Sequence, residues 1–176
     1  FHNSQKKTIY YDNAVIKIYD LPIFYLPKLS HPDPSVDRRS GFLVPTSTHS
    51  KNLGFGVSVP YFVNLSNDKN FTFTNNFYVD ENPLFNAEYH QVFKDSSFIA
   101  DLGYTEGYKK ESATKTPGSK SHFFSKFIKN FKLNNESENK LSVSLQRVSD
   151  DKYLKLYKLK SNLVDYETDT LESSID

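Results

Sequence analysis

The feature that most constrains this chain is the alternation of apolar and polar residues in segments of about ten residues. Successive side chains of a β-strand point to opposite faces, so this alternation predicts strands that have one apolar and one polar face. In Leu84–Phe93, for example, Phe85 and Tyr89 share one face, and Asn86 and Glu88 share the other. Helical periodicity is nearly absent. The predicted strands are Thr8–Tyr19, Arg39–His49, Phe55–Asn64, Phe71–Asp80, Leu84–Phe93, Phe98–Lys110, His122–Leu133 and Leu141–Val148.

Strand length and composition are compatible with two all-β classes. Strands of about 9–11 residues are long enough to cross a bilayer when they are tilted. The chain is rich in aromatic residues (15%) but has a low mean hydropathy of −0.61. Both outer-membrane β-barrels and soluble β-sandwiches have one wet and one dry strand face, so both fit this composition. Periodicity alone leaves the two classes open, and no apolar run approaches the length of a membrane-spanning helix.

Charge and residue types give little support to catalysis or nucleic-acid binding. The net charge of +1 provides no electrostatic basis for a nucleic-acid partner. The chain has no cysteine, which excludes a disulfide scaffold and thiolate chemistry in this piece. Ser112–Lys115 matches an S-x-x-K pattern but lies in a polar loop without the partner motifs. Asp165, Glu167 and Asp169 alternate on a strand-like segment and could gather a divalent cation, although a solvated strand face is the favoured interpretation. We therefore predict no catalytic residue, no metal site and no cofactor.

Two prolines lie inside the predicted hairpin of Arg39–His49 with Phe55–Asn64. Proline has no backbone N–H and is normally excluded from paired strands. The register that aligns the apolar faces pairs Phe42 with Val63, Val44 with Tyr61 and Pro45 with Pro60. The sequence therefore predicts a single weakened rung, and a seam that can open there.

Proline also marks a predicted boundary between two units. Pro22–Pro34 is interpreted as an extended connector that follows Thr8–Tyr19, on which Ala14, Ile16 and Ile18 share a face. We expect residues 1–33 to form one unit and residues 34–176 another. The chain opens without an initiator methionine and ends within a pattern, which is typical of a piece of a longer protein.

Several motifs in order resemble the family of the LPS-assembly protein LptD. The most specific are Leu21–Pro27 (LPIFYLP), His31-Pro32, Arg38–Pro45 (RRSGFLVP) and Pro60–Asn64 (PYFVN). Further segments that resemble the family are Thr72–Thr74 with Phe77-Tyr78, Glu88-Tyr89, and Gln146–Lys155. The sequence departs from the family at Asn75-Asn76, at His90-Gln91 and at Lys28, where Pro-Arg, Arg-Tyr and an aromatic residue are usual. The resemblance covers most of residues 20–156.

This resemblance implies transport rather than enzymatic catalysis. It implies the last strands of a periplasmic β-jelly roll, followed by the first strands of a large outer-membrane β-barrel with an antiparallel meander. Pro45 and Pro60 match the prolines of the family's lateral gate. The motif at the start of the barrel comprises Arg38, Arg39, Gly41, Phe42, Tyr61 and Asn64. The lipid path at the exit of the jelly roll would include Ala14, Ile16, Ile18, Ile23 and Tyr25.

The implied partners are lipopolysaccharide, outer-membrane lipids, a lipoprotein plug of the LptE type and a periplasmic bridge protein of the LptA type. The implied location is the outer membrane of a Gram-negative cell, with the N-terminal part in the periplasm. The residues themselves leave two alternatives open. One is a soluble β-sandwich that binds carbohydrate, and the other is an ordinary porin, which the connector and the paired prolines disfavour.

Overall fold

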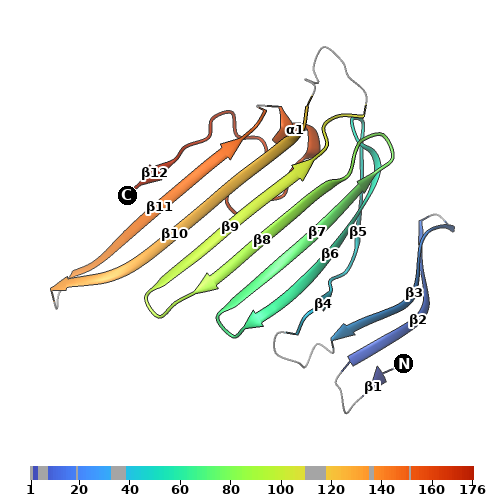
Figure 1. The fold of residues 1–176 in the computed structure, drawn as a ribbon, viewed down its shortest axis with the longest axis horizontal. Coiled ribbons are helices and arrows are strands. Elements are labelled where there is room, and N and C mark those ends of the chain that lie inside the picture. The colour runs from blue at the N-terminus through green and yellow to red at the C-terminus, as the bar shows by residue number, and fades with distance from the viewer. Residues whose placement is uncertain are drawn as a thin grey trace.

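The computed structural model is built almost entirely of antiparallel strands in two sheets (Figure 1). It describes residues 2–3, 8–18, 20–32, 39–109, 118–134, 137–150 and 152–176. Among these residues, no helix is long and apolar enough to cross a membrane.

The larger sheet is a meander in which strands that are consecutive in the chain lie side by side (Figure 1). Its order is β12-β11-β10-β9-β8-β7-β6-β4, and β5 also pairs with β6. The strands are β4 (Gly41–Phe42), β5 (Thr46–Ser50), β6 (Gly54–Ser66), β7 (Lys69–Tyr78), β8 (Leu84–Val92), β9 (Ser96–Thr105), β10 (Lys120–Asn134), β11 (Ser137–Val148) and β12 (Ser174–Ile175). The predicted all-β antiparallel fold is thus confirmed, and the two edges of the sheet do not meet in this chain.

The smaller sheet has the order β1-β2-β3, formed by β1 (His2–Asn3), β2 (Thr8–Ile18) and β3 (Leu21–Pro32). The interpretation of Pro22–Pro34 as a connector is wrong for β3, which pairs with β2 along its length. A strand at the edge of a sheet tolerates proline, because a missing N–H on its outer side breaks no ladder bond. Residues 33–38 lie outside the described part of the chain, so the boundary between residues 33 and 34 stays a prediction.

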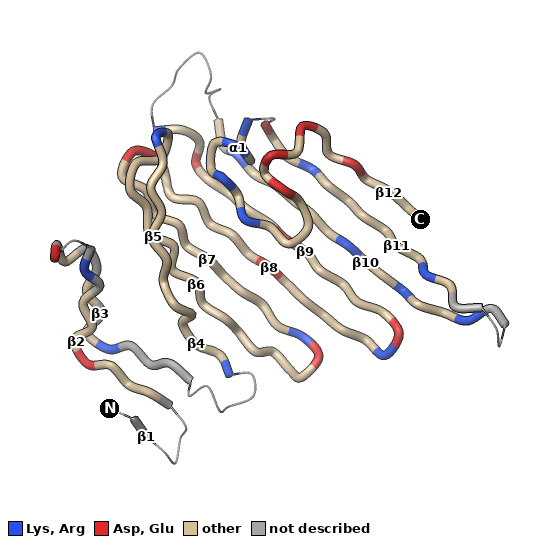
Figure 2. Tube along the Cα trace, turned by 180° about the vertical axis from the view of Figure 1, so that it is seen from behind, with Lys and Arg blue, Asp and Glu red and all other residues tan. Residues whose placement is uncertain are grey.

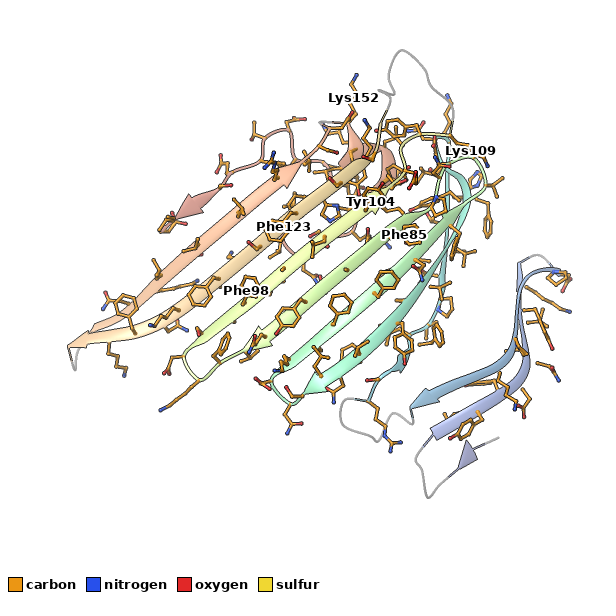
Figure 3. All side chains as sticks on the ribbon, in the orientation of Figure 1. Phe85, Phe98, Tyr104, Lys109, Phe123 and Lys152 are labelled. Carbon is orange, nitrogen blue, oxygen red and sulfur yellow. The ribbon has the colours of Figure 1, made fainter. Side chains whose placement is uncertain are left out.

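The larger sheet has one apolar and one polar face, as the alternation predicts. Residues that pair directly across antiparallel strands share a face. Phe85 pairs with Tyr104, whereas Glu88 pairs with Asp101. The apolar face carries Tyr61, Phe73, Phe85, Leu102, Tyr104 and Leu145, all substantially exposed, and Figure 3 shows Phe85, Phe98, Tyr104 and Phe123 along it. A β-sandwich would bury this face beneath a second sheet, and no described strand lies over it.

The polar face is covered at one end by residues 152–171, here called the C-terminal segment (Figures 1 and 2). This segment begins with the short helix α1 (Tyr153–Tyr157) and leads into β12. The hydrophobic core of the described residues lies between the segment and the sheet, and comprises Leu53, Leu84, Phe124, Tyr153, Leu154, Tyr157, Leu159 and Val164. The prediction that Asp165–Asp169 is strand-like is wrong, because this stretch forms turns against the sheet.

Candidate lateral seam and polar face

The predicted strand Arg39–His49, observed as β4 and β5, is the first strand of the larger sheet and forms the first hairpin with β6. The line along which it pairs with β6, here called the seam, is interrupted by a β-bulge. Gly41 pairs with Phe62 at one end of the interruption, and Thr46 pairs with Ser58 at the other. Phe42 also pairs with Tyr61, so the three residues 43–45 of the first strand stand opposite the two residues 59–60 of β6. An extra residue of this kind leaves a position unpaired and bends the strand. The predicted strand Arg39–His49 is consequently divided into β4 and β5.

The bulge corrects the predicted register. Phe42 pairs with Tyr61, which is two residues away from the partner that the aligned apolar faces suggest. Val44 and Pro45 have no ladder partner, so the predicted pair of Pro45 with Pro60 does not form. Both prolines nevertheless border the same interruption. The inserted residue shifts the alternation by one position, so that Phe42 and Ser47 share a face, but the stretch Thr46–Ser50 has no apolar residue that could reveal the shift.

Pro60 weakens the seam from the β6 side. The Leu43 N–H donates a hydrogen bond of 2.9 Å to the Pro60 carbonyl. In an antiparallel strand the N–H and C=O of one residue point toward the same neighbouring strand. The donor that Pro60 lacks would therefore face the first strand, while β7 pairs with β6 on the other side through Thr74. The weakness lies at the seam and not within the β6–β7 ladder.

The residues of the barrel-start motif gather around the β4 end of the seam. The rings of Phe42 and Tyr61 meet edge to face, with centroids 4.9 Å apart. The Asn64 N–H donates a 2.8 Å hydrogen bond to the Ser40 hydroxyl. Gly41 is buried and Arg39 is exposed. Of the predicted set, Arg38 lies outside the described residues. This end has two ladder pairs, whereas β5 has five.

The structure divides the predicted lipid path between two faces of the β2–β3 hairpin. Ala14 pairs with Leu26, whereas Val15 pairs with Tyr25, so Ala14 and Tyr25 lie on opposite faces. Tyr25 and Val15 are exposed, and the Tyr25 hydroxyl donates to the Asn13 side chain at 2.6 Å. The side chains of the remaining predicted residues are outside the described part of the structure, namely Ile16, Ile18 and Ile23.

A pocket of about 510 Å³ lies between the polar face and the C-terminal segment. Ser58 donates to Asn76 at 2.6 Å, and Asn76 donates to the Leu84 carbonyl at 3.1 Å. Glu88 accepts a hydrogen bond of 2.8 Å from Asn162 of the segment. The buried Asn86 side-chain oxygen has no hydrogen-bond partner within the described part of the chain. The pocket thus offers hydroxyl, amide and carboxylate groups beside the apolar side chains of Leu53, Leu84 and Leu159.

No metal centre or catalytic set emerges in the described ranges. No group of three His, Asp or Glu residues there could hold a metal ion. Asp169 is paired with Lys155, whose ammonium group holds the pKa of this exposed carboxyl below its ordinary value. Ser112–Lys115 lies outside the described residues.

Buried polar contacts fix the start of the C-terminal segment to the sheet. The Tyr153 hydroxyl lies 3.2 Å from Nδ1 of His122, whose Nε2 is 3.3 Å from Asp101. Nearby, Lys120 and Asp150 form a buried ion pair at 3.4 Å. Burial raises the pKa of Tyr153 above its ordinary value, and the neighbouring Tyr157 and Asp101 add to this effect. The neutral phenol is therefore the docked form.

Sequence reasoning missed this anchor. His122 was one of five scattered histidines, and nothing in its spacing links it to Tyr153. The available signal was Gly103, which interrupts a strand pattern. A Cβ at Gly103 would collide with the His122 ring and would lie 2.9 Å from the Asn86 oxygen. A glycine within a strand often marks such a close approach.

Comparison with curated proteins gives partial matches of one kind. The chain is 38% identical over 80 residues to the "LPS-assembly protein LptD" of Psychrobacter arcticus, which covers 46% of this chain and 9% of that protein. It is 46% identical over 59 residues to the LptD of Francisella tularensis subsp. novicida, covering 32% of this chain and 6% of the relative. It is 42% identical over 65 residues to the LptD of Shewanella sp. MR-4, covering 37% and 8%.

The chain is related to the LptD family. The resemblance inferred from the motifs is thereby confirmed. The matched stretches cover less than a tenth of the length of each of these LptD proteins. No family model matches it.

Proposed function

We propose that this chain is part of a lipopolysaccharide transport and assembly protein of the Gram-negative outer membrane, and that its first strands form one side of a lateral gate. The interrupted seam carries this proposal. A closed barrel satisfies every backbone group, and an unpaired group in lipid costs several kcal/mol. A strand can leave its neighbour at low cost only where few ladder bonds exist. The bulge and the donorless side of Pro60 supply that condition between the first strand and β6.

The two faces of the larger sheet fit the two parts of a glycolipid. The exposed aromatic face suits acyl chains, and the polar face with its pocket suits a sugar moiety. The aromatic face would then contact outer-membrane lipids, as in other barrels. A lipoprotein plug of the LptE type would meet the polar face inside the barrel.

The orientation follows from the turns and from the N-terminal sheet. β4 begins at the same end as the short turns that follow β6 and β8, whereas the C-terminal segment lies at the opposite end (Figure 1). Outer-membrane barrels have short periplasmic turns and longer external loops. We therefore place β1–β3 in the periplasm, where a bridge protein of the LptA type would deliver lipid to the exposed face that carries Val15 and Tyr25.

Replacing both seam prolines tests the gate. Pro60→Ala returns a donor to the side that faces the first strand, and Pro45→Ala removes the constraint beside the bulge. One net ladder hydrogen bond contributes about 0.5–1.5 kcal/mol. The bond restored at position 60 would therefore reduce the open population by roughly two- to 13-fold. We expect the double variant of the full-length protein to deliver lipopolysaccharide to the cell surface more slowly.

Pro83→Ala is the matched control, because Pro83 lies in the turn between β7 and β8, away from the seam. Delivery is measured by labelling surface lipopolysaccharide at equal levels of folded protein. Delivery that is the same in the double variant, the Pro83→Ala variant and the parent protein would remove the proposed gate.

A further inference from the structure

We propose that the C-terminal segment is an internal brace that holds the β5 half of the first hairpin in place, so that the seam loosens only from the β4 half. The order in which the two halves separate is a property of the hairpin itself, and its role in transport rests on the proposed function.

Leu53 joins the hairpin to the segment. It lies in the turn between β5 and β6 and is only 2% exposed, within a core that includes Leu159 of the segment. The turn is itself well fixed, because the Leu53 N–H donates to the Ser50 hydroxyl at 3.1 Å. The Asp80 N–H donates to the Leu53 carbonyl at 3.2 Å and ties the turn to the end of β7.

The segment reaches the hairpin from anchors on several strands. Tyr157 lies 5.7 Å from Tyr78 at the end of β7, measured between ring centroids, and its hydroxyl is 3.4 Å from Thr105 on β9. Asn162 donates to Glu88 on β8. Thr46 of β5 lines the same pocket as Leu159. The segment thus contacts β7, β8 and β9 on the polar face and shares a pocket with β5.

The β4 half has no comparable support among the described residues. The hydrophobic core contains no residue of the stretch 39–46. Val44 is 72% exposed and Leu43 is 43% exposed, so the bulge buries little apolar surface. This half is held by the two ladder pairs of β4, by the hydrogen bonds from Leu43 to Pro60 and from Asn64 to Ser40, and by the Phe42–Tyr61 ring contact, with β3 beside it. Separation that starts at the bulge therefore disturbs few contacts, whereas separation that starts at β5 must also displace the Leu53 turn from the core.

Disulfides that close each half separately test the order of opening. Phe42 pairs with Tyr61 in the β4 half, and Ser47 pairs with Val57 in the β5 half. Both are non-hydrogen-bonded pairs, because the odd-numbered residues of β6 turn their backbone groups toward β7, as the bond from Val79 to Phe55 indicates. Such pairs have Cα atoms about 4.5 Å apart, which is within the range that a disulfide spans. The 176 residues given contain no cysteine, so each pair introduces the only thiols of this part of the protein.

We expect the Phe42→Cys/Tyr61→Cys protein to stop delivering lipopolysaccharide when it is oxidised and to recover with dithiothreitol. The Ser47→Cys/Val57→Cys protein should form its disulfide and keep delivering. Equal loss of delivery with both disulfides would overturn the brace, because both halves would then have to open.

Hydrogen exchange gives a readout that does not depend on transport. In the full-length protein, Leu53→Ala and Leu159→Ala should each accelerate exchange of the β5 amides at least about ten-fold, because each leaves a cavity at the brace contact. The control is Leu145→Ala, which removes a side chain of similar size from the exposed apolar face of β11. Exchange in β5 that does not change in either brace variant would overturn the inference even if the seam prolines prove essential for delivery.

Discussion

Truncating Tyr157 should release the C-terminal segment from the polar face. This side chain is 3% exposed and sits among three other tyrosine rings, with centroids 5.5 Å from Tyr153, 5.7 Å from Tyr78 and 6.3 Å from Tyr108. Replacing a buried aromatic residue by alanine costs about 3–5 kcal/mol. Aromatic pairs contribute about 0.5–1.5 kcal/mol each beyond their burial. The docking free energy lost in Tyr157→Ala should therefore be about 3–5 kcal/mol or more.

The assay is limited proteolysis of the folded full-length protein. Lys158 and Lys160 are exposed and lie directly after α1, but trypsin needs a locally unfolded backbone in order to cut there. When opening is fast, the cleavage rate follows the population of the open form. A loss of 3–5 kcal/mol in docking free energy raises that population by about 10² to more than 10³. Cleavage in the segment should accelerate by this factor in Tyr157→Ala, while cleavage elsewhere stays unchanged.

Tyr157→Phe is the matched control. It keeps the ring and removes only the hydroxyl, whose 3.4 Å approach to Thr105 is a weak contact. This variant should remain within about ten-fold of the parent rate, since one neutral hydrogen bond contributes about 1 kcal/mol. If alanine and phenylalanine give the same cleavage rate, the aromatic packing does not hold the segment, and the reasoning from the core is refuted.

Three further predictions concern charge and burial. Lys120→Gln should lower the free energy of unfolding by about 3–5 kcal/mol in chaotrope unfolding, because it removes the ammonium group that pairs with the buried Asp150 carboxylate. Adding Asp150→Asn should recover part of this loss. Strictly additive effects of the two substitutions would contradict the pairing. Leu102→Lys on the apolar face should cost about 2–4 kcal/mol for folding into lipid vesicles, whereas Thr72→Lys on the polar face should be nearly neutral; equal effects would argue against a lipid-facing surface. Burial raises the pKa of Tyr153 above its ordinary value of 10.0, so docking of the segment should be fully present below pH 10 and weaken as the pH rises above it. Cleavage by subtilisin between pH 8 and pH 11 measures this dependence, which should become shallower in Tyr153→Phe, because Tyr157, whose pKa burial also raises, remains in the docked segment.

Local pattern was sufficient for the strands and for their two faces. Side-chain direction in a strand depends only on position along the strand. Alternation in Leu84–Phe93 therefore correctly places Phe85 and Glu88 on opposite faces of the sheet. The order of the larger sheet was also accessible, because short turns force consecutive strands to lie together. The predicted β2 was correct, but β3 was taken for a connector because its prolines conceal its pairing.

The details of the seam required the tertiary structure. Both prolines were visible in the sequence, yet the bulge that separates β4 from β5 depends on how many residues each strand uses to span the same distance. The direction of the missing Pro60 donor likewise depends on the pairing register. The two prolines led to the prediction of a weak rung, whose register is wrong, and their role in a gate stays a prediction.

The amino-acid sequence by itself determined that this chain forms an antiparallel sheet with an aromatic face and a polar face, and its motifs determined the family resemblance. Only the tertiary structure decided that residues 152–171 fold back over the polar face and hold the first hairpin at Leu53. The physical reason is the range of the interactions. Alternation is a property of neighbouring residues, whereas the contact of Tyr153 with His122 and the core that Leu53 shares with Leu159 join residues far apart in the chain and leave no periodic trace in it.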